Sequence, residues 1–241
     1  MRLDALHHIT CVCRNAQRTV AFYRDLGFRL VKKTVNFDDP GSYHLYFGDK
    51  RGSPGTLITF FEWPNAERGR LGLGTLESIA LTVPGGEEPR EVEDPDGLRL
   101  VLEPGERVGL HHVSAYGNPD LYAGIVGEDA PLRFAESPGQ VAVIGAGTTH
   151  HIAWRAADEE EQRSWQERLT EIGLRPTPIQ DRKYFRSIYF RMPDGLLIEI
   201  ATDGPGFAVD EPADELGGSL ALPDWLEPQR DELERELAPI P

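Results

Sequence analysis

The chain has 241 residues, 39% of them hydrophobic, and a formal net charge of −15 at pH 7. This length allows one large domain or two modest ones with a real core, and the negative charge, with no basic cluster to offset it, excludes nucleic acid and anionic membranes as expected partners. No run of about 18 apolar residues is present and the start, MRLDALHH, lacks a signal-peptide pattern, so we expect a cytoplasmic protein without a membrane span.

The first predicted strand, LHHITCV at residue 6, introduces a phrase that returns along the chain. It recurs as LESIALTV at 76, LHHVSAY at 110 and THHIAWR at 149. A second phrase, a glycine followed by an apolar run, occurs as GTLITFFE at 55, GLRLVLE at 97, GQVAVIG at 139 and GLLIEIA at 195. Such runs are typical of strands. The chain is therefore predicted to contain four units, each with an opening and a closing strand.

Helices are predicted only in the first and fourth units. In the first, Asn15 is the expected N-cap and Gly27 the expected end; in the fourth, Asp158 and Gly173 have these roles. A turn is predicted at residues 38–41. Units two and three are too short for a full helix, with at most a remnant around NPDLYAGIVG. The cysteines, Cys11 and Cys13, are expected to be reduced core thiols.

Several long phrases carry a resemblance to a known family: HHITCVCRNAQRTVAFYRDLGFRLVKKTVNFD, YHLYFGDKRGSPGTLITFF, DRKYFRSIYFRMPDGLLIEIATDGPGF and LPDWLEPQR. The chain resembles the vicinal-oxygen-chelate (glyoxalase/bleomycin resistance/dioxygenase) superfamily, and within it the ring-cleaving dioxygenases of hydroquinones and related dihydroxylated aromatics. The resemblance implies an α+β fold in which repeated βαβββ modules pair into open mixed-sheet cups, here with two modules complete and two shortened.

The expected domain organisation follows these units. The N-terminal half, residues 1–104, has a complete module at 1–65 and a shortened one at 74–104. The C-terminal half, residues 108–208, has a shortened module at 108–146 and a complete one at 147–208. Residues 209–241 form an acidic tail with a short amphipathic helix. Trp225 and Leu226 are expected to pack on the body or on a second copy of the chain, so a homo-oligomer is the alternative to a monomer.

Aligning the units predicts where a metal binds. His8 falls opposite Ser78, His112 and His151 in the opening strands, and Glu199 falls opposite Thr59, Val101 and Val143 in the closing strands. If the helix-bearing units pair, one cup contains His8, His151 and Glu199, with Thr59 as a weak fourth group. The other cup then has one histidine with two valines, which cannot hold a divalent metal. A shifted site that uses His112 in place of His8 is the alternative if the units pair differently.

The residue types favour oxygen chemistry at this site. Glu199 lies in an apolar strand, where an unpaired carboxylate is costly, so a cation is expected beside it. Two histidines and one carboxylate leave open positions on the metal, which is typical of non-haem Fe(II) enzymes. Mn(II) is the alternative metal.

Further site residues come from strand alternation and from the resemblance. Alternation places Tyr189 on the cup face, and by repeat symmetry Tyr46 with His44, although a satisfied strand histidine is the favoured interpretation of His44. The resemblance places Arg182, Tyr189, His7 and Thr10 near the metal. A surface ion pair is the alternative role for Arg182. Alternation points His7 away from the cup, so the two arguments disagree there unless a bulge intervenes.

The leading functional hypothesis is an Fe(II)-dependent dioxygenase that cleaves the ring of a hydroquinone or catechol with O2. Its partners are then a small aromatic diol and O2. The alternatives are a glyoxalase-type metal-dependent isomerase or lyase and a metal-free ligand-binding member of the same fold. A glyoxalase-type site usually has four protein ligands, whereas Thr59 stands at the fourth position here.

Overall fold

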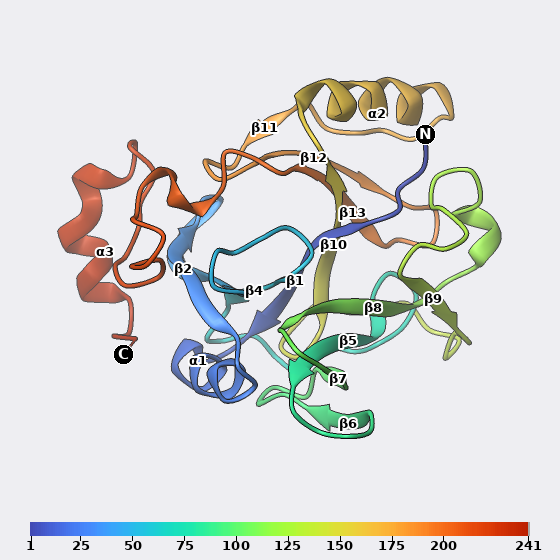
Figure 1. Cartoon of the computed structure of the whole chain (residues 1–241). Coiled ribbons are helices and arrows are strands. Elements are labelled where there is room, and N and C mark those ends of the chain that lie inside the picture. Colours follow the sequence, from blue (N-terminus) through green and yellow to red (C-terminus); the bar gives the residue numbers. More distant parts are fainter. Residues whose placement is uncertain (241) are drawn as a thin grey trace.

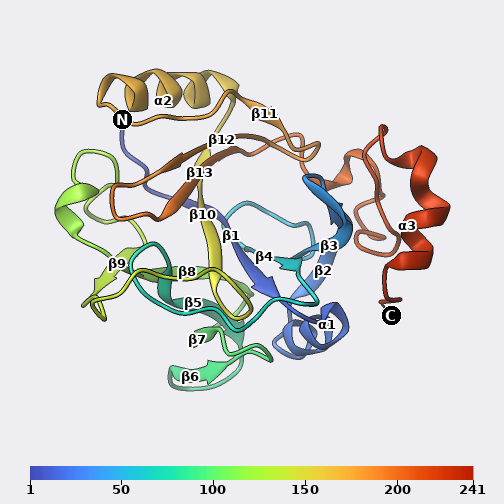
Figure 2. The same cartoon turned by 180° about the vertical axis from the view of Figure 1, so that it is seen from behind.

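The computed structural model describes residues 1–240 and contains two mixed sheets (Figures 1 and 2). The larger has eight strands in the order β11–β12–β13–β10–β1–β4–β3–β2. Its strands are β1 (Leu6–Cys13), β2 (Arg29–Asn36), β3 (Asp39–Gly48), β4 (Leu57–Glu62), β10 (Thr149–Ala156), β11 (Gln180–Asp181), β12 (Arg186–Arg191) and β13 (Leu197–Thr202). The smaller has the order β6–β7–β5–β8–β9. Its strands are β5 (Leu76–Pro84), β6 (Arg90–Glu93), β7 (Arg99–Gly105), β8 (Gly109–Tyr116) and β9 (Leu132–Ala135).

The larger sheet joins the first and the last units of the chain. β1 pairs antiparallel with β10, with Ile9 opposite Ile152, so the strands of unit one continue into those of unit four. The same sheet runs outward to β2 on one edge and β11 on the other. The predicted α+β fold, with the two helix-bearing units sharing one curled sheet, is confirmed.

Two capped helices cover the larger sheet, as predicted. In α1 (Ala16–Asp25), the Asn15 side chain accepts a hydrogen bond from Arg18 N. In α2 (Glu159–Glu171), Asp158 accepts one from Glu161 N. The apolar faces of both helices are buried on the sheet through Val20, Tyr23, Trp165 and Leu169. In place of a helix, unit three has a 3₁₀ turn, η1 (Pro119–Leu121).

Strand β1 is buried on both faces, and this separates its side chains into two groups. Ile9, with the reduced thiols of Cys11 and Cys13, belongs to a core that includes Ile79 and Val113 of the smaller sheet. His8, on the other face, lines a cavity inside the larger sheet. The strand that carries a candidate ligand therefore shares a core with the smaller sheet.

The structure corrects the predicted closing strand of unit three. Residues 139–145 belong to no strand; isolated bridges join residues 141–146 to the linker at 68–73, such as Leu73 with Val141. β9 pairs with β8 instead. Glycines explain the linker pairing, since a Cβ on Gly72 would lie 2.3 Å from the Gln140 carbonyl oxygen. The predicted turn at 38–41 also shifts: the turn is Phe37–Asp38, and β3 begins at Asp39.

The tail runs along β2 and contains η2 (Phe207–Val209), η3 (Glu227–Gln229) and α3 (Arg230–Glu236); it is orange to red in Figure 1. Leu226 and Trp225 precede the helix; Leu226 is buried as expected, whereas Trp225 is 59% exposed. The described residues include no helix long and apolar enough to cross a bilayer.

A buried ion cluster fastens this tail to both edges of the larger sheet. Lys32 of β2 is fully buried, and its Nζ donates to Asp210 at 2.6 Å and to Glu211. Lys183, in the β11–β12 turn, also contacts Asp210, at 2.9 Å. A buried lysine is tolerable only with such partners. Asp210 thus links β2 to the opposite edge of the sheet.

Candidate metal centre

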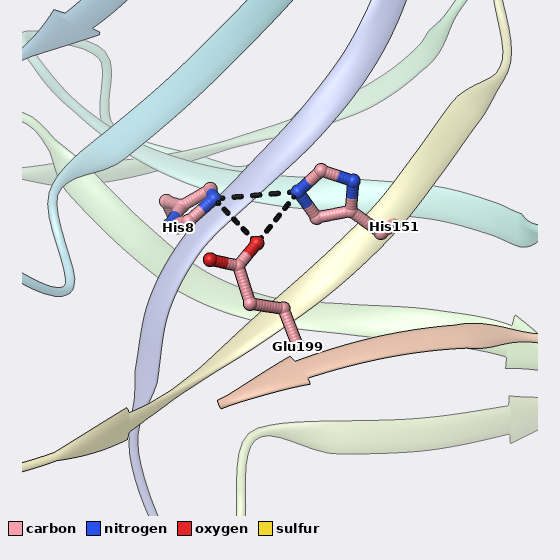
Figure 3. Close-up of side chains that lie close together, drawn as sticks. All are labelled: His8, His151 and Glu199. Carbon is pink, nitrogen blue, oxygen red and sulfur yellow. Dashed lines mark hydrogen bonds and ion pairs between the residues drawn. The ribbon is translucent and has the colours of Figure 1, made fainter. Parts of the chain in front are cut away.

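Three buried side chains from adjacent strands converge at the centre of the larger sheet (Figure 3). His8 comes from β1, His151 from β10 and Glu199 from β13. Glu199 Oε2 lies 3.3 Å from His8 Nε2 and 2.9 Å from His151 Nε2, and the two Nε2 atoms are 3.4 Å apart. The residues that repeat symmetry predicted to share one cup are therefore in contact.

The donor set fits a divalent metal. Three ligands about 2.1 Å from an ion and at right angles stand about 3 Å apart, close to the observed separations. Glu199 Oε2 is buried without a hydrogen bond, whereas Oε1 accepts one from Ser187 Oγ at 2.5 Å. Burial raises the pKa of Glu199, but the two imidazoles outweigh this and hold the pKa well below its usual value. A carboxylate oriented on one oxygen, with the other aimed at two imidazoles, is suited to ligation.

Each of the two imidazoles is backed by the histidine that precedes it in the sequence. His8 Nδ1 lies 2.9 Å from His7 Nδ1, and His151 Nδ1 lies 2.8 Å from His150 Nδ1. Burial lowers the pKa of both His7 and His150 to about 3, so both stay neutral at pH 7 and can accept a hydrogen bond from a ligand's Nδ1–H. Such a hydrogen bond fixes the orientation of a metal-ligating imidazole.

The position of His7 resolves a conflict between the two sequence arguments. The register of β1 against β10 shifts between Leu6 and His8, which marks an irregularity in the ladder. His7 does not line the cavity; it lies behind His8 and packs on Phe185 with ring centroids 5.1 Å apart. Alternation was right that His7 leaves the cup face, and the resemblance was right that it lies near the site.

Thr59 is already engaged by its neighbours. Its Oγ1 lies 2.9 Å from Thr10 Oγ1 and 3.0 Å from His44 Nε2. His44 Nδ1 lies 3.0 Å from Tyr46 Oη, so both ring nitrogens have partners. Burial, with the nearby His8, holds the pKa of His44 well below its usual value. This chain of contacts keeps Thr59 oriented within the wall and leaves three residues as the candidate ligand set.

Arg182 and Tyr189 form the polar side of the cavity. Arg182 Nε donates to Tyr189 Oη at 3.2 Å, and another guanidinium nitrogen lies 3.3 Å from an oxygen of Asp38. Burial raises the pKa of Tyr189, with Glu199 adding to the effect, so the phenol stays protonated. Because its oxygen accepts from Arg182, the hydroxyl hydrogen of Tyr189 is free for another acceptor.

These groups line a cavity of about 380 Å³. Beyond its polar floor the wall is largely aromatic. The sequence reasoning missed these lining residues: Phe37, Asp38, Phe61, Trp63, His150 and Phe185. His150 could have been found, since it repeats the relation of His7 to the next histidine. The aromatic residues gave no comparable signal, because apolar residues in and beside strands are usually core.

The smaller sheet lacks an equivalent ligand set, for a different reason than the sequence indicated. Ser114 pairs with Arg133 in β9 as Ala153 pairs with Glu199 in β13, so Arg133, and not Val143, is the counterpart of Glu199. An arginine there repels a cation. Ligand atoms of Glu103, His111 and His112 also lie within 4.8 Å of one another. The contact between these histidines matches the other His-His pairs and so needs no metal.

Comparisons with known proteins agree with this architecture. Residues 5–200 match the model of the Glyoxalase/Bleomycin resistance protein/Dioxygenase superfamily. MhqO of Bacillus subtilis, provisionally named a ring-cleaving dioxygenase, is 37% identical over 98% of this chain and 96% of its own length. The chlorohydroquinone/hydroquinone 1,2-dioxygenase of Sphingobium indicum is 30% identical over 98% of this chain and 96% of its own length.

Solved structures show the same fold. A provisionally named dioxygenase from Bacillus subtilis superposes with a TM-score of 0.92 at 34% identity and covers 100% of this chain and 98% of its own. A variant of glyoxalase I from Zea mays reaches a TM-score of 0.61 at 14% identity, with 83% of this chain and 92% of that chain covered, which shows a shared fold alone.

Proposed function

The chain belongs to the glyoxalase/bleomycin resistance/dioxygenase superfamily, and we propose that it is an Fe(II)-dependent dioxygenase that cleaves the ring of a hydroquinone or a catechol with O2. The names of two relatives that align over almost the whole chain support ring cleavage. The observation that carries the proposal is the buried set of two imidazoles and one carboxylate at the floor of an aromatic cavity.

Three protein ligands suit oxygen chemistry better than the isomerase alternative. Fe(II) bound to His8, His151 and Glu199 would supply neighbouring open positions for a phenolate oxygen and dioxygen, and a route for electrons between them. An isomerase site of the glyoxalase type usually has a fourth protein ligand. Thr59, the residue at that place, is instead hydrogen-bonded within the wall.

The cavity residues have complementary tasks towards a diol. The Arg182 guanidinium attracts a phenolate oxygen and holds Tyr189 by its oxygen. Tyr189 donates its free hydrogen to a substrate oxygen and so helps to orient the ring. His7 and His150 accept from His8 and His151, which keeps both Nε2 atoms aimed at the metal. Their neutral state preserves this acceptor role at neutral pH.

The test is anaerobic reconstitution with Fe(II) or Mn(II), measurement of metal content, and then oxygen uptake with hydroquinone and catechol in parallel. We expect one metal per chain and uptake with one class of diol, giving a ring-opened product that contains both atoms of dioxygen. Glu199→Ala should abolish uptake, whereas Glu103→Ala, the matched carboxylate change on the smaller sheet, should retain it.

Each other result points to a named alternative. One metal per chain without uptake refutes the dioxygenase and favours the isomerase, which is then assayed with a thiol adduct. Failure to bind any metal favours the metal-free ligand-binding protein. The shifted set is not formed, because His112 lies on the smaller sheet; loss of metal in His112→Ala but not in His8→Ala would place the metal at the cluster of Glu103, His111 and His112.

A further inference from the structure

The turn between β2 and β3 forms part of the mouth of the metal cavity. Phe37 and Asp38, the two turn residues, both line the cavity. Asp38 is an exposed residue whose carboxylate reaches Arg182 at 3.3 Å. Because β2 is one edge of the larger sheet and Arg182 follows the other edge, β11, this ion pair spans the open side of the sheet.

Phe37 packs on an aromatic residue of the tail. Its ring centroid lies 5.6 Å from that of Trp225, with the planes at 77°, an edge-to-face geometry. Trp225 does not itself line the cavity, and it is 59% exposed. It therefore touches the cavity only through Phe37.

The tail near Trp225 is fastened to both sides of the mouth. Ala221 N donates to Lys33 O at 2.9 Å, which continues the β2 edge. Lys183 Nζ donates to Leu222 O at 2.8 Å from the β11–β12 turn. Trp225 is thus held at a defined place three residues later and gives Phe37, in the β2–β3 turn, a fixed neighbour.

The cavity is larger than a bare aromatic ring requires. An apolar cavity of about 150 Å³ accommodates benzene, whereas this one measures about 380 Å³. A ring that places one phenolic oxygen at the polar floor projects its substituents towards the aromatic wall. Phe37 belongs to this wall at the mouth, beside the ion pair of Asp38 with Arg182, and its ring offers an apolar contact to an uncharged substituent.

We propose that Phe37 determines which uncharged ring substituents the cavity accepts, and that Trp225 is the positioning residue that holds it there. This inference rests on the proposed function, because it takes a ring diol as the ligand. Truncation of Phe37 removes the apolar contact with a substituent, whereas truncation of Trp225 leaves Phe37 present but free to move. Both changes should act on discrimination between substituted and bare rings.

The experiment measures anaerobic binding of hydroquinone and tert-butylhydroquinone to the Fe(II)-loaded protein by calorimetry, followed by KM and kcat for both. We define the affinity ratio as the affinity for tert-butylhydroquinone divided by that for hydroquinone. We expect Phe37→Ala to reduce this ratio about tenfold, which is the effect of losing a small apolar contact in a pocket. Trp225→Ala should reduce the affinity ratio about threefold to fivefold, and in turnover it should change KM rather than kcat. Trp225→Phe should restore the affinity ratio. Val209→Ala, an equally exposed change in the same tail, is the control.

An unchanged ratio in both Phe37→Ala and Trp225→Ala overturns the inference while leaving the dioxygenase intact. Wild-type protein that binds both diols but consumes no oxygen overturns the proposed function, and the binding ratio still decides the role of Phe37. Wild-type protein that binds neither diol overturns both. A change in ratio with Trp225→Ala that Trp225→Phe does not restore shows that aromatic packing is not what positions Phe37.

Discussion

Replacing Glu199 by Gln tests the metal centre through stability, independently of turnover. Glutamine keeps the size of the side chain and an acceptor oxygen for Ser187 Oγ, which lies 2.5 Å from Glu199 Oε1. It removes the negative charge that faces His8 and His151 at 3.3 and 2.9 Å. Because changes to groups that only orient metal ligands cost about 10–100-fold in metal affinity, loss of an anionic ligand should cost about 100-fold or more.

The expected magnitude follows from mass action. Metal at about 100 times the wild-type Kd adds about 2.7 kcal/mol to the free energy of unfolding. A variant that binds about 100-fold more weakly gains only about 0.4 kcal/mol at the same concentration. For a chain of 241 residues, 1 kcal/mol corresponds to about 2–4 °C in Tm. Wild type should therefore gain about 5–11 °C from metal, and Glu199→Gln about 1 °C.

Thermal unfolding followed by circular dichroism, with and without anaerobic Fe(II), measures both gains. Glu103→Gln is the matched control, because Glu103 belongs to the histidine cluster of the smaller sheet. An undiminished metal-induced rise in the Tm of Glu199→Gln would refute the ligand assignment. Loss of that rise in Glu103→Gln would instead locate the metal on the smaller sheet.

Three further changes test other parts of the structure. His150→Phe keeps an aromatic ring but removes the hydrogen-bond acceptor for His151, so metal affinity should fall about 10–100-fold. A metal titration that gives the variant the same affinity as wild type would show that His150 contributes only packing. Lys32→Met removes the buried ammonium that contacts Asp210, and urea unfolding should show that the free energy of unfolding falls by about 3–5 kcal/mol. A fall of less than about 1 kcal/mol contradicts the argument that this ion pair is buried and stabilising. Asp94 is buried directly after β6, where its Oδ1 accepts hydrogen bonds from Asp96 N and Leu98 N. Burial raises its pKa to about 6, so the stability that the protonated form contributes is lost as pH rises through 6. Asp94→Asn should therefore add about 1–3 kcal/mol to the free energy of unfolding at pH 8 and nothing below about pH 4, and a gain independent of pH would disprove this linkage.

The convergence of the candidate ligands was predictable from the sequence because the units repeat. His8 and His151 occupy equivalent positions in the opening strands and Glu199 lies in a closing strand, so the assumption that the two helix-bearing units pair places the three residues together. The helices were also predictable, since Asn15 and Asp158 cap them through local hydrogen bonds. Local patterns and repeat symmetry were sufficient for these features.

Other features depend on contacts that no local pattern records. Strand alternation takes His7 off the cup face but does not predict its contact with His8, because the ladder shifts register there and a register shift depends on the partner strand. The phrase at 139–145 has the composition of a closing strand, yet it forms bridges with the linker at 68–73, and β9 takes its expected place in the sheet. The contact between Phe37 and Trp225 joins residues far apart in the chain and has no signature in either segment.

The central pairing of β1 with β10 has a consequence for biosynthesis. A ribosome releases β1 long before β10, so the nascent N-terminal half carries an unpaired strand edge that must avoid wrong partners until residues 149–202 have been made. Such distant pairing is also slow to form. During this interval the chain offers a metal only one of its three candidate ligands. The order of synthesis therefore delays metal capture until the last strands of the sheet are in place, and a prematurely terminated chain would lack the centre altogether.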